Sequence, residues 1–312
     1  MIFTLTLNPA VDYELTVPAV EFDSVLRASE SSVDFGGKGF NVSRQLKAME
    51  TPSTALGFLG GHAGELLRDG LQGLGIGTDF VWVSGETRTN VSIVTQSHDH
   101  YIKVNEKGPS VDLANQTELL DKIDLLAQRG DWWVLAGSLP PGVGNDFYAE
   151  ILKVLNKHGS RVILDTSGDS LRLGCIEKPY LVKPNVEEAR LITGLPMDTP
   201  AEIAAAAAGI QKLGAQNVVV SMGKMGALLQ NPDGAWLAHS PMIEEKNPTG
   251  AGDSLVGGVV WALERGIALK ESLGWGVASG AATASLSGTK VGSRGLIEKF
   301  FSEVRFESLE TV

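Results

Sequence analysis

Strand-like and helix-like segments alternate along most of this chain, and the alternation restricts its possible folds more than any other feature. Apolar runs typical of buried strands occur at residues 2–7, 131–137, 161–167, 180–185 and 217–223. Segments with helical spacing or helix-forming composition occur at 39–49, 64–75, 117–130, 147–159 and 201–214. Repeated strand–helix–strand units favour a mostly parallel sheet with helices on both faces. The sequence therefore predicts an α/β fold, a three-layer αβα sandwich.

Two regions break this pattern. Residues 12–20 with 26–35, and residues 87–96 with 100–108, alternate polar and apolar side chains, as strands with one exposed face do. A polar turn at Ser97–Asp99 would join the second pair. We expect antiparallel strands at about 12–35 and 87–108 to form a small β-sheet, a lid, inserted into a single domain of residues 1–312.

Composition narrows the range of partners. The formal net charge is -11 and no Lys/Arg cluster occurs, which argues against nucleic acid or an anionic membrane. No run approaches the roughly 18 apolar residues that a membrane span needs, and the first residues read as a strand rather than a signal peptide. Cys175 is the single cysteine, so no disulfide can form within the chain. We expect a buried, inert thiol and a cytoplasmic setting.

The run NPTGAGDS at 247–254 places an acid between small residues and a predicted helix. Glycines allow successive N–H groups to point at one spot, and a helix N-terminus adds positive charge, so the run is suited to an anion. Asp253 there could take a proton from a hydroxyl while the N–H groups hold a phosphoryl group. It could equally cap a helix at Leu255–Arg265, and the run alone leaves both readings open.

Two further motifs combine turns with polar side chains. In FGGKGFN, Gly36, Gly37 and Gly39 allow close backbone approach before a helix whose first turn carries Asn41. The alternative is a tight turn with a solvated Lys38. No Walker A pattern is present.

In KPNVEE, a strand delivers Lys183, and Asn185 and Glu188 share one helix face. This pair could orient hydrated Mg²⁺, or could cap a surface helix. Ser138 in AGSLPPG, and Ser221 with Gly223 in SMGKMGA, also end predicted strands. Ligands bind at such strand ends in open α/β sheets.

The motifs LTLNPAVD, FGGKGFNVSR, GSLPPG, KPNVEE, SMGKMGA and TGAGDS follow one another in this order from Thr4 to about Gly288. In this order they resemble the ribokinase-like sugar kinases, specifically the phosphofructokinase B branch. Within it, the chain is most similar to the group of bacterial 1-phosphofructokinases and tagatose-6-phosphate kinases. The resemblance implies a ribokinase-like fold, ATP and Mg²⁺ as cofactors, and phosphorylation of a ketohexose phosphate.

The resemblance also implies a role for each motif. Asp253 would be the catalytic base, and the backbone of Gly250, Ala251 and Gly252 would form the anion hole. Carried over to this sequence, the sugar contacts are Asp12, Gly36, Gly37 and Asn41. The candidates for the phosphate of the substrate are Arg88, Lys103 and Ser138, with Arg27 and Lys38 as weaker ones.

The nucleotide would lie along the later motifs, and the resemblance assigns to it Lys183, Asn185, Ser221, Gly223, Gly226 and Thr249. Asn185 and Glu188 would lie near Mg²⁺, through water. The segment 276–288 is similar to a late helix of the family beside the adenine, and its small residues also suit close helix packing.

The favoured reaction converts fructose 1-phosphate to fructose 1,6-bisphosphate, with tagatose 6-phosphate or fructose 6-phosphate as the alternative acceptor. A kinase of an unphosphorylated sugar or nucleoside is disfavoured by Arg88 and Lys103, and a non-catalytic sugar-phosphate sensor by the intact GAGD run. A dinucleotide-binding oxidoreductase is disfavoured because the first strand leads to NPAVD, without GxGxxG. Because free sheet edges tend to be paired, we also expect a homodimer formed through the lid.

Overall fold

A large sheet forms the centre of the molecule in the computed structural model, which describes residues 1–96 and 101–309. Within this described part it has eleven strands, in the order β15-β14-β13-β12-β11-β10-β9-β1-β4-β5, with β6 paired to β4. The strands are β1 (Ile2–Thr6), β4 (Thr54–Leu59), β5 (Gly77–Thr78), β6 (Val81–Trp82), β9 (Trp132–Ala136), β10 (Arg161–Asp165), β11 (Leu181–Val182), β12 (Asn217–Ser221), β13 (Gly226–Asn231), β14 (Gly234–His239) and β15 (Arg305–Leu309).

The strands from β12 to β5 run parallel, and β13, β14 and β15 add an antiparallel edge. Both faces of the parallel strands are buried. In β10, Val162 and Leu164 pack into one hydrophobic core, while Ile163 packs into the other. This explains why the strands read as continuous apolar runs instead of alternating ones. The prediction of a mostly parallel sheet is confirmed.

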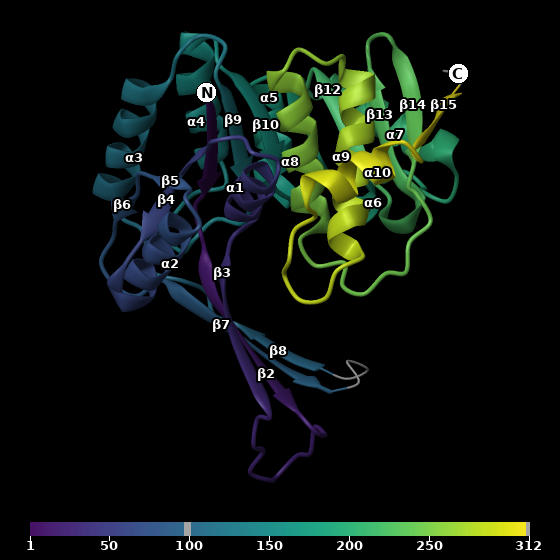
Figure 1. Ribbon diagram of the computed structural model, residues 1–312. Coiled ribbons are helices and arrows are strands. Elements are labelled where there is room, and N and C mark those ends of the chain that lie inside the picture. The colour runs from purple at the N-terminus through teal and green to yellow at the C-terminus, as the bar shows by residue number, and fades with distance from the viewer. Residues whose placement is uncertain (97–100, 310–312) are drawn as a thin grey trace.

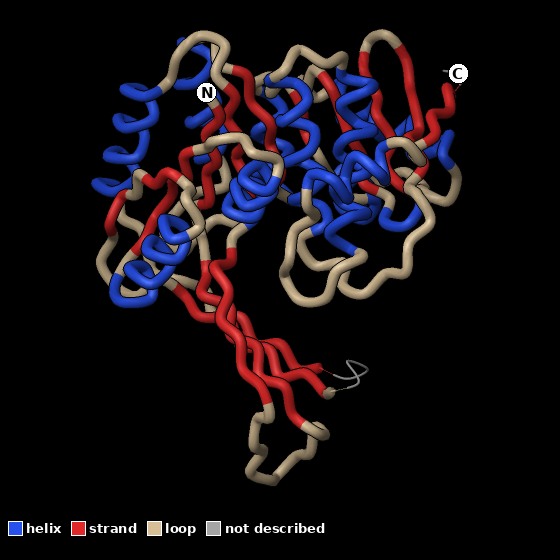
Figure 2. The backbone as a smooth tube through the Cα atoms, viewed as in Figure 1, coloured by secondary structure: helices blue, strands red, loops and turns tan. Residues whose placement is uncertain are grey.

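Helices cover both faces of the sheet (Figures 1 and 2). One core holds side chains of α1 (Lys38–Ala48), α8 (Ala251–Glu264), α9 (Leu269–Ala284) and α10 (Arg294–Phe301). The other holds those of α3 (Leu113–Leu126), α4 (Phe147–His158), α5 (Gly168–Ile176), α6 (Val186–Thr193) and α7 (Pro200–Lys212). Helix α2 (Gly61–Gly73) packs in a smaller cluster with Val11 and Phe40, and a 3-10 turn spans Gly223–Met225. The three-layer αβα architecture is therefore confirmed.

A second sheet, here called the lid sheet, projects from the main body (Figure 1). It consists of β2 (Ala10–Val17), β3 (Glu30–Gly36), β7 (Arg88–Thr95) and β8 (Tyr101–Asn105), in the order β3-β2-β7-β8. The small inserted sheet was predicted correctly, but its strands are not all antiparallel, because β2 and β7 pair in parallel. Both strands start at the main body and run outward, so they share one direction. The turn predicted at Ser97–Asp99 lies outside the described residues.

Two expectations from composition can be compared with the fold. Cys175 on α5 is buried, and burial raises the pKa of its thiol to about 12, in agreement with an inert side chain. In the part of the chain that the structure describes, no helix has both the length and the apolar character needed to cross a membrane.

Candidate active site

The motifs meet at the edge of the large sheet where the parallel strands end. Backbone hydrogen bonds tie these ends together: Gly137 N–H donates to Asp165 O at 3.0 Å, and Ser221 N–H donates to Pro184 O at 3.0 Å. Helices α1 and α8 both begin above this edge, so their first turns face the strand ends. Residues far apart in the sequence thus form one site.

Helix α8 begins at Ala251, directly after Gly250, whose φ of 77° is left-handed and suits glycine. The N–H of Ala251 donates to Pro248 O at 3.1 Å. The next N–H groups, of Gly252 and Asp253, belong to the first helical turn and have no partner within the helix. The turn therefore presents backbone donors and the positive end of α8 to an anion.

Asp253 is not the cap of a helix at Leu255–Arg265, which was one of the two readings of the sequence. It is the third residue of α8, and its side chain makes no capping hydrogen bond. Instead, Oδ2 accepts a hydrogen bond from Asn41 Nδ2 at 2.7 Å. The first turn of α1 thus orients the carboxylate at the start of α8.

The Asp253 carboxylate lies in a buried and charged environment, with 7% of the residue exposed. Burial, with the negative charge of Asp165 in addition, raises the pKa of Asp253 to about 6. The hydrogen bond from Asn41 and the charges of Lys38 and Lys183 act in the opposite direction. A carboxyl group with this pKa is ionised at neutral pH and accepts a proton more readily than an ordinary aspartate.

Sequence reasoning did not single out Asp165, the last residue of β10. Its Oδ1 lies 3.1 Å from Lys38 Nζ and 3.4 Å from Lys183 Nζ. Burial opposes the charge of Lys38, but Asp165 and Asp253 raise its pKa above the ordinary value. A signal was present in the sequence, because an acid closes an apolar strand at the edge where the other motifs end.

A small cavity of about 40 Å³ lies next to Gly250 and to Asn41, the hydrogen-bond partner of Asp253. It is lined by Asp12, Asp34, Gly36, Asn41, Thr249, Gly250, Thr283, Thr289 and Val291. Asn90 Nδ2 donates to Asp12 Oδ1 at 2.7 Å, and burial raises the pKa of Asp12. A Cβ on Gly36 would lie 2.1 Å from Asp12 Oδ2, so a side chain there would displace the Asp12 carboxylate. Gly37 precedes α1 with a φ of 150°.

Asn90 and the Asp34–Arg44 ion pair at 2.8 Å were also missed from the sequence. The lid sheet gives both their positions. Asp12 of β2 pairs with Asn90 of β7 on one side and with Asp34 of β3 on the other.

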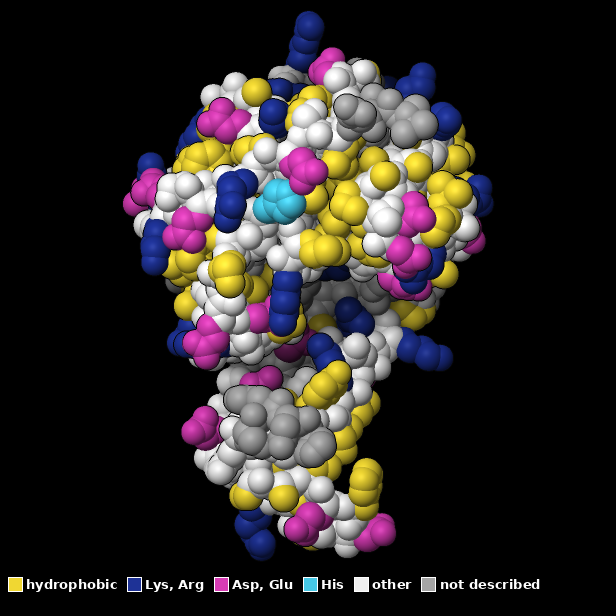
Figure 3. Space-filling view, turned by 90° about the vertical axis from the view of Figure 1, so that its right-hand side faces the viewer, with side chains coloured by type: hydrophobic (Ala, Val, Ile, Leu, Met, Phe, Trp, Pro, Cys, Tyr) yellow, Lys and Arg dark blue, Asp and Glu magenta, His cyan; other side chains and the backbone are white. Residues whose placement is uncertain are grey.

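A hollow lies between the main body and the lid sheet, with Lys and Arg side chains beside it (Figure 3). Arg88 starts β7, and its Nε donates to Asn8 O at 3.2 Å and Pro9 O at 3.3 Å. Burial lowers the pKa of Arg88. Lys103 on β8 is exposed and its charge acts on Asp12, while Ser138 is exposed after β9. Arg27 is not brought to the site: it lies in the exposed loop at the outer end of the lid sheet.

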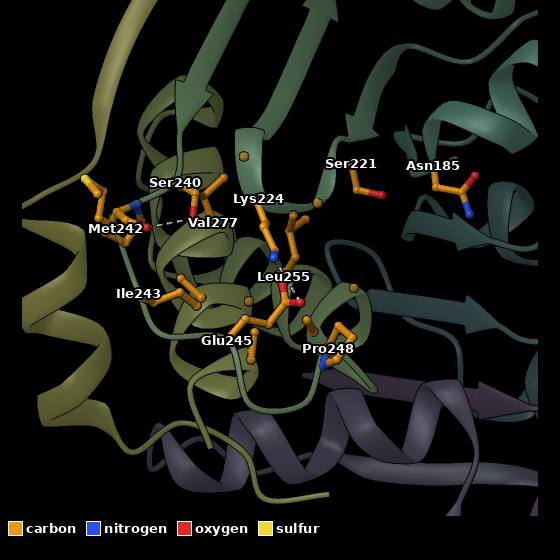
Figure 4. Close-up of a pocket in the computed structure, with 18 residues that line it drawn as sticks. Asn185, Ser221, Lys224, Ser240, Met242, Ile243, Glu245, Pro248, Leu255 and Val277 are labelled. Atoms are coloured by element: carbon orange, nitrogen blue, oxygen red, sulfur yellow. Dashed lines mark hydrogen bonds and ion pairs between the residues drawn. The ribbon is translucent and has the colours of Figure 1, made fainter. Parts of the chain in front are cut away.

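A larger cavity of about 470 Å³ lies on the other side of the GAGD turn. Its lining includes Asn185, Ser221, Gly223 and Gly226 of the sequence motifs, with Ala251, Gly252 and Leu255 of α8. Figure 4 shows Ser221 and Asn185 toward one end and Met242, Ile243 and Val277 toward the other. The apolar end is lined by Val277, Gly280, Ala281 and Ala284 of α9, within the small-residue segment predicted beside adenine. Thr249 lines the small cavity instead.

Asn185 and Glu188 form a reciprocal cap on α6. Asn185 Oδ1 accepts from Glu188 N–H at 2.8 Å, and Glu188 Oε2 accepts from Asn185 N–H at 2.9 Å. The capping reading of this pair is therefore realised, and it leaves Glu188 Oε1 free of hydrogen bonds to the described residues. Among those residues, no group of three or more His, Cys, Asp and Glu side chains is arranged to hold a metal ion.

This geometry can be compared with known proteins. The model of the pfkB family of carbohydrate kinases matches residues 5–294. The chain belongs to this family. It is 36% identical over 313 residues to a protein of Borreliella burgdorferi named 1-phosphofructokinase, covering 100% of both chains. It is also 34% identical over 266 residues to a tagatose-6-phosphate kinase of Staphylococcus epidermidis, covering 84% of this chain and 85% of that one.

Solved structures resemble this pfkB-family kinase along nearly its whole length. Phosphofructokinase-2 from Escherichia coli, in complex with potassium, superposes with a TM-score of 0.92 at 29% identity, covering 96% of this chain and 98% of that one. The ribokinase of Arabidopsis thaliana superposes with a TM-score of 0.79 at 20% identity, covering 96% and 98%. The expected ribokinase-like fold is therefore confirmed, and the chain is a carbohydrate kinase.

Proposed function

We propose that this kinase transfers the γ-phosphoryl group of ATP to a hydroxyl of a phosphorylated ketohexose, with fructose 1-phosphate as the preferred acceptor and fructose 1,6-bisphosphate as the product. One observation carries the proposal: Asp253 lies buried at the start of α8, where Gly250 and Asn41, the hydrogen-bond partner of Asp253, line a small polar cavity, and where Ala251 and Gly252 line a larger cavity with an apolar end. Relatives named 1-phosphofructokinase support the choice of acceptor.

In the proposed reaction, Asp253 takes the proton of the acceptor hydroxyl. The acceptor oxygen forms a bond to the γ-phosphorus as the bond from that phosphorus to the bridging oxygen of ADP breaks. The N–H groups of Gly250 and Gly252 hold the oxygens of the phosphoryl group during transfer, while the N–H of Ala251, also assigned to the anion hole, already donates to Pro248 O. This assignment agrees with the general requirement of phosphoryl transfer for positioning and charge stabilisation.

The larger cavity fits ATP. Its volume of about 470 Å³ lies in the usual range of ligand pockets. Small residues of α9 leave room for a flat base at the apolar end, and Gly223 and Gly226 allow the backbone to approach the nucleotide. Lys183 is buried and points toward the GAGD turn, where the terminal phosphate would lie.

Mg²⁺ fits this site as an ion held mainly by ATP and water, since the described residues offer no three-ligand cluster. Asn185 and the free oxygen of Glu188 would orient its hydration shell at the mouth of the cavity. When bound, the ion neutralises negative charge on the phosphates.

The lid sheet would hold the acceptor. Asp12, Asn90 and Lys103 lie on one face of it, since Asp12 pairs with Asn90 and Lys103 lies two residues from Asn105, the partner of Asn90. We propose that Asp12 and Asn41 bind sugar hydroxyls, and that Arg88, Lys103 and Ser138 bind the existing phosphate. The main body and the lid sheet would then work as one kinase domain.

The opposite face of the lid sheet is apolar and supports a homodimer. Val33, Tyr13, Val91 and Val104 form one row across the four strands. Of the outer strands, Val33 is 45% exposed and Val104 is 60% exposed. We propose that a second copy of the chain covers this row.

An acceptor panel tests the proposed function. ADP release is measured with ATP and fructose 1-phosphate, tagatose 6-phosphate, fructose 6-phosphate or unphosphorylated fructose. We expect the highest kcat/KM with fructose 1-phosphate and the lowest with fructose. A preference for tagatose 6-phosphate or fructose 6-phosphate would select the alternative acceptor, and equal activity on free fructose would overturn the role given to Arg88 and Lys103.

A further inference from the structure

Asp165 joins two lysines that come from separate elements. Lys38 is the first residue of α1, and Lys183 follows β11, yet both ammonium groups lie within 3.4 Å of the same oxygen, Asp165 Oδ1. Asp165 is 1% exposed, and its second oxygen, Oδ2, is buried without a hydrogen-bond partner among the described residues. Among the described residues, the two lysines are therefore the only hydrogen-bonding or ion-pairing partners of this carboxylate.

We propose that Asp165 is a positioning residue that holds the Lys38 and Lys183 ammonium groups where the transferred phosphoryl group passes. The inference rests on the proposed kinase function and deepens it. The position of Lys183 supports it directly, because a Cβ built on Gly252 would lie 3.6 Å from Lys183 Nζ. The lysine therefore reaches the backbone turn to which the anion hole is assigned.

The charges of Asp165, Lys38 and Lys183 explain why the two lysines need a carboxylate between them. Two ammonium groups at one place repel each other, and Lys183, with 4% exposure, has little water to stabilise its charge. A carboxylate between them offsets this repulsion. The side chain of Lys38 is 40% exposed, so without Asp165 it is free to turn toward solvent. Asp165 thereby keeps positive charge facing Asp253.

Other groups around the cluster have been assigned to other contacts. Tyr148 donates its hydroxyl to Gly137 O at 3.1 Å, and Glu188 acts on Lys38 only through its charge. Asn41 donates to Asp253 and carries no charge. The charged groups that face Asp253 are therefore Asp165, Lys38 and Lys183.

Asp165→Asn tests the proposal with a nearly isosteric side chain. The asparagine keeps the volume but loses the charge that pairs with the lysines. We expect kcat to fall about 10²-fold, as for other misplaced catalytic groups, and KM for ATP to rise severalfold.

Asp131→Asn is the matched control. Asp131 is also a buried aspartate, 5% exposed, and its carboxylate pairs with the amino group of Met1 at 2.9 Å, at the amino end of β9 and away from the site. We expect its kcat to stay within twofold of the wild-type value. Thermal unfolding of both variants shows whether either has lost its fold.

The pH profile tests the direct electrostatic effect of Asp165 on Asp253. Removing the negative charge of Asp165 lowers the pKa of Asp253, so the acid limb of kcat/KM moves to lower pH in Asp165→Asn. The phosphosugar itself ionises near pH 6, which is about the second pKa of a phosphate monoester. Because that ionisation is common to both enzymes, the difference between their profiles reports the enzyme group.

Two further measurements complete the test. If Asp165 acts through Lys38, the loss of activity in Asp165→Asn/Lys38→Met is smaller than the product of the two single losses. Affinities for ATP and ADP, measured by calorimetry without sugar, do not depend on the acceptor. The wild type should prefer ATP over ADP, and Asp165→Asn should reduce this preference.

The proposal is overturned if Asp165→Asn matches the wild type, or if its loss of activity and that of Lys38→Met simply multiply in the double variant. Failure of the proposed function is a different result, namely a wild type that transfers phosphate to no sugar phosphate. In that case the ratio of ATP to ADP affinity still decides the role of Asp165.

Discussion

At the residue scale, the proposed sugar site depends on the absence of a side chain at Gly36. Gly36 has no space for a side chain, since a Cβ would lie 2.1 Å from Asp12 Oδ2. We expect Gly36→Ala to raise KM for the sugar phosphate at least tenfold by displacing Asp12, while KM for ATP is unchanged. Steady-state kinetics with each substrate varied check this.

Gly73→Ala in α2 is the control for that variant, because a Cβ there meets nothing within 4 Å. A methyl group in a helix is tolerated or slightly favourable, by up to about 1 kcal/mol. Equal effects of the two variants on KM for the sugar would contradict the role given to Asp12.

The buried charge of Asp253 also has a consequence for stability. Its pKa of about 6 lies above that of an unfolded aspartate, so the folded chain binds this proton more tightly. The contribution to stability is therefore complete below the unfolded pKa and is lost as pH rises through about 6. We expect Asp253→Asn to be more stable than the wild type at pH 8, by roughly 1–3 kcal/mol, with a smaller difference at pH 5. Unfolding in urea at both pH values measures it, and a constant difference would argue against the raised pKa.

At the element scale, helices α8 and α9 pack against each other and together line the larger cavity, to which we assign ATP. The helices approach closely at Gly258, where a Cβ would lie 2.5 Å from Trp275 O. We expect Gly258→Ala to destabilise the protein by about 1–3 kcal/mol and to raise KM for ATP. Thermal unfolding and kinetics check this, with Gly295→Ala in α10, which has open space, as the control. An unchanged KM for ATP would show that the contact between the two helices does not determine the shape of the cavity.

Among the strands, some features could be predicted from the sequence and others could not. The periodicity of β10 and its neighbours predicts a parallel sheet, because burial on both faces leaves a direct trace in composition. The role of Asp165 leaves only a weaker trace, an acid at the end of an apolar strand, since its partners, Lys38 and Lys183, are brought to it by the order of strands. For the same reason, the parallel pairing of β2 with β7 could not be predicted from their alternating residues.

In the active site, the sequence indicated Asp253 as an acid at a glycine turn but left its helix position open. The structure places it inside the first turn of α8, where Asn41 holds it. The partner could not be predicted by spacing, because 212 residues separate the two. Glu188 shows the reverse case, in which the pattern of a capping box was visible and is formed.

At the scale of the whole molecule, the two faces of the lid sheet differ in chemistry, and we assign a different proposed role to each. Its polar face turns toward the site, and its apolar row is free for a second copy. We expect the wild type to sediment as a dimer and Val104→Asp to shift it toward monomer. Leu125→Asp is the control, because Leu125 is 84% exposed on α3 of the main body. A wild type that is monomeric at micromolar concentration would contradict the proposed interface.

The proposed kinase function depends on proton transfer to Asp253 between two bound substrates. The most direct measurement is kcat of Asp253→Asn with ATP and the best acceptor, beside ATP affinity from calorimetry. If Asp253 is the base, kcat falls by about 10²–10⁴-fold or more, the usual contribution of a general base, while the affinity for ATP stays within severalfold of the wild-type value. A loss of only tenfold or less, in a folded variant that still binds ATP, would contradict the assignment of Asp253 as the base.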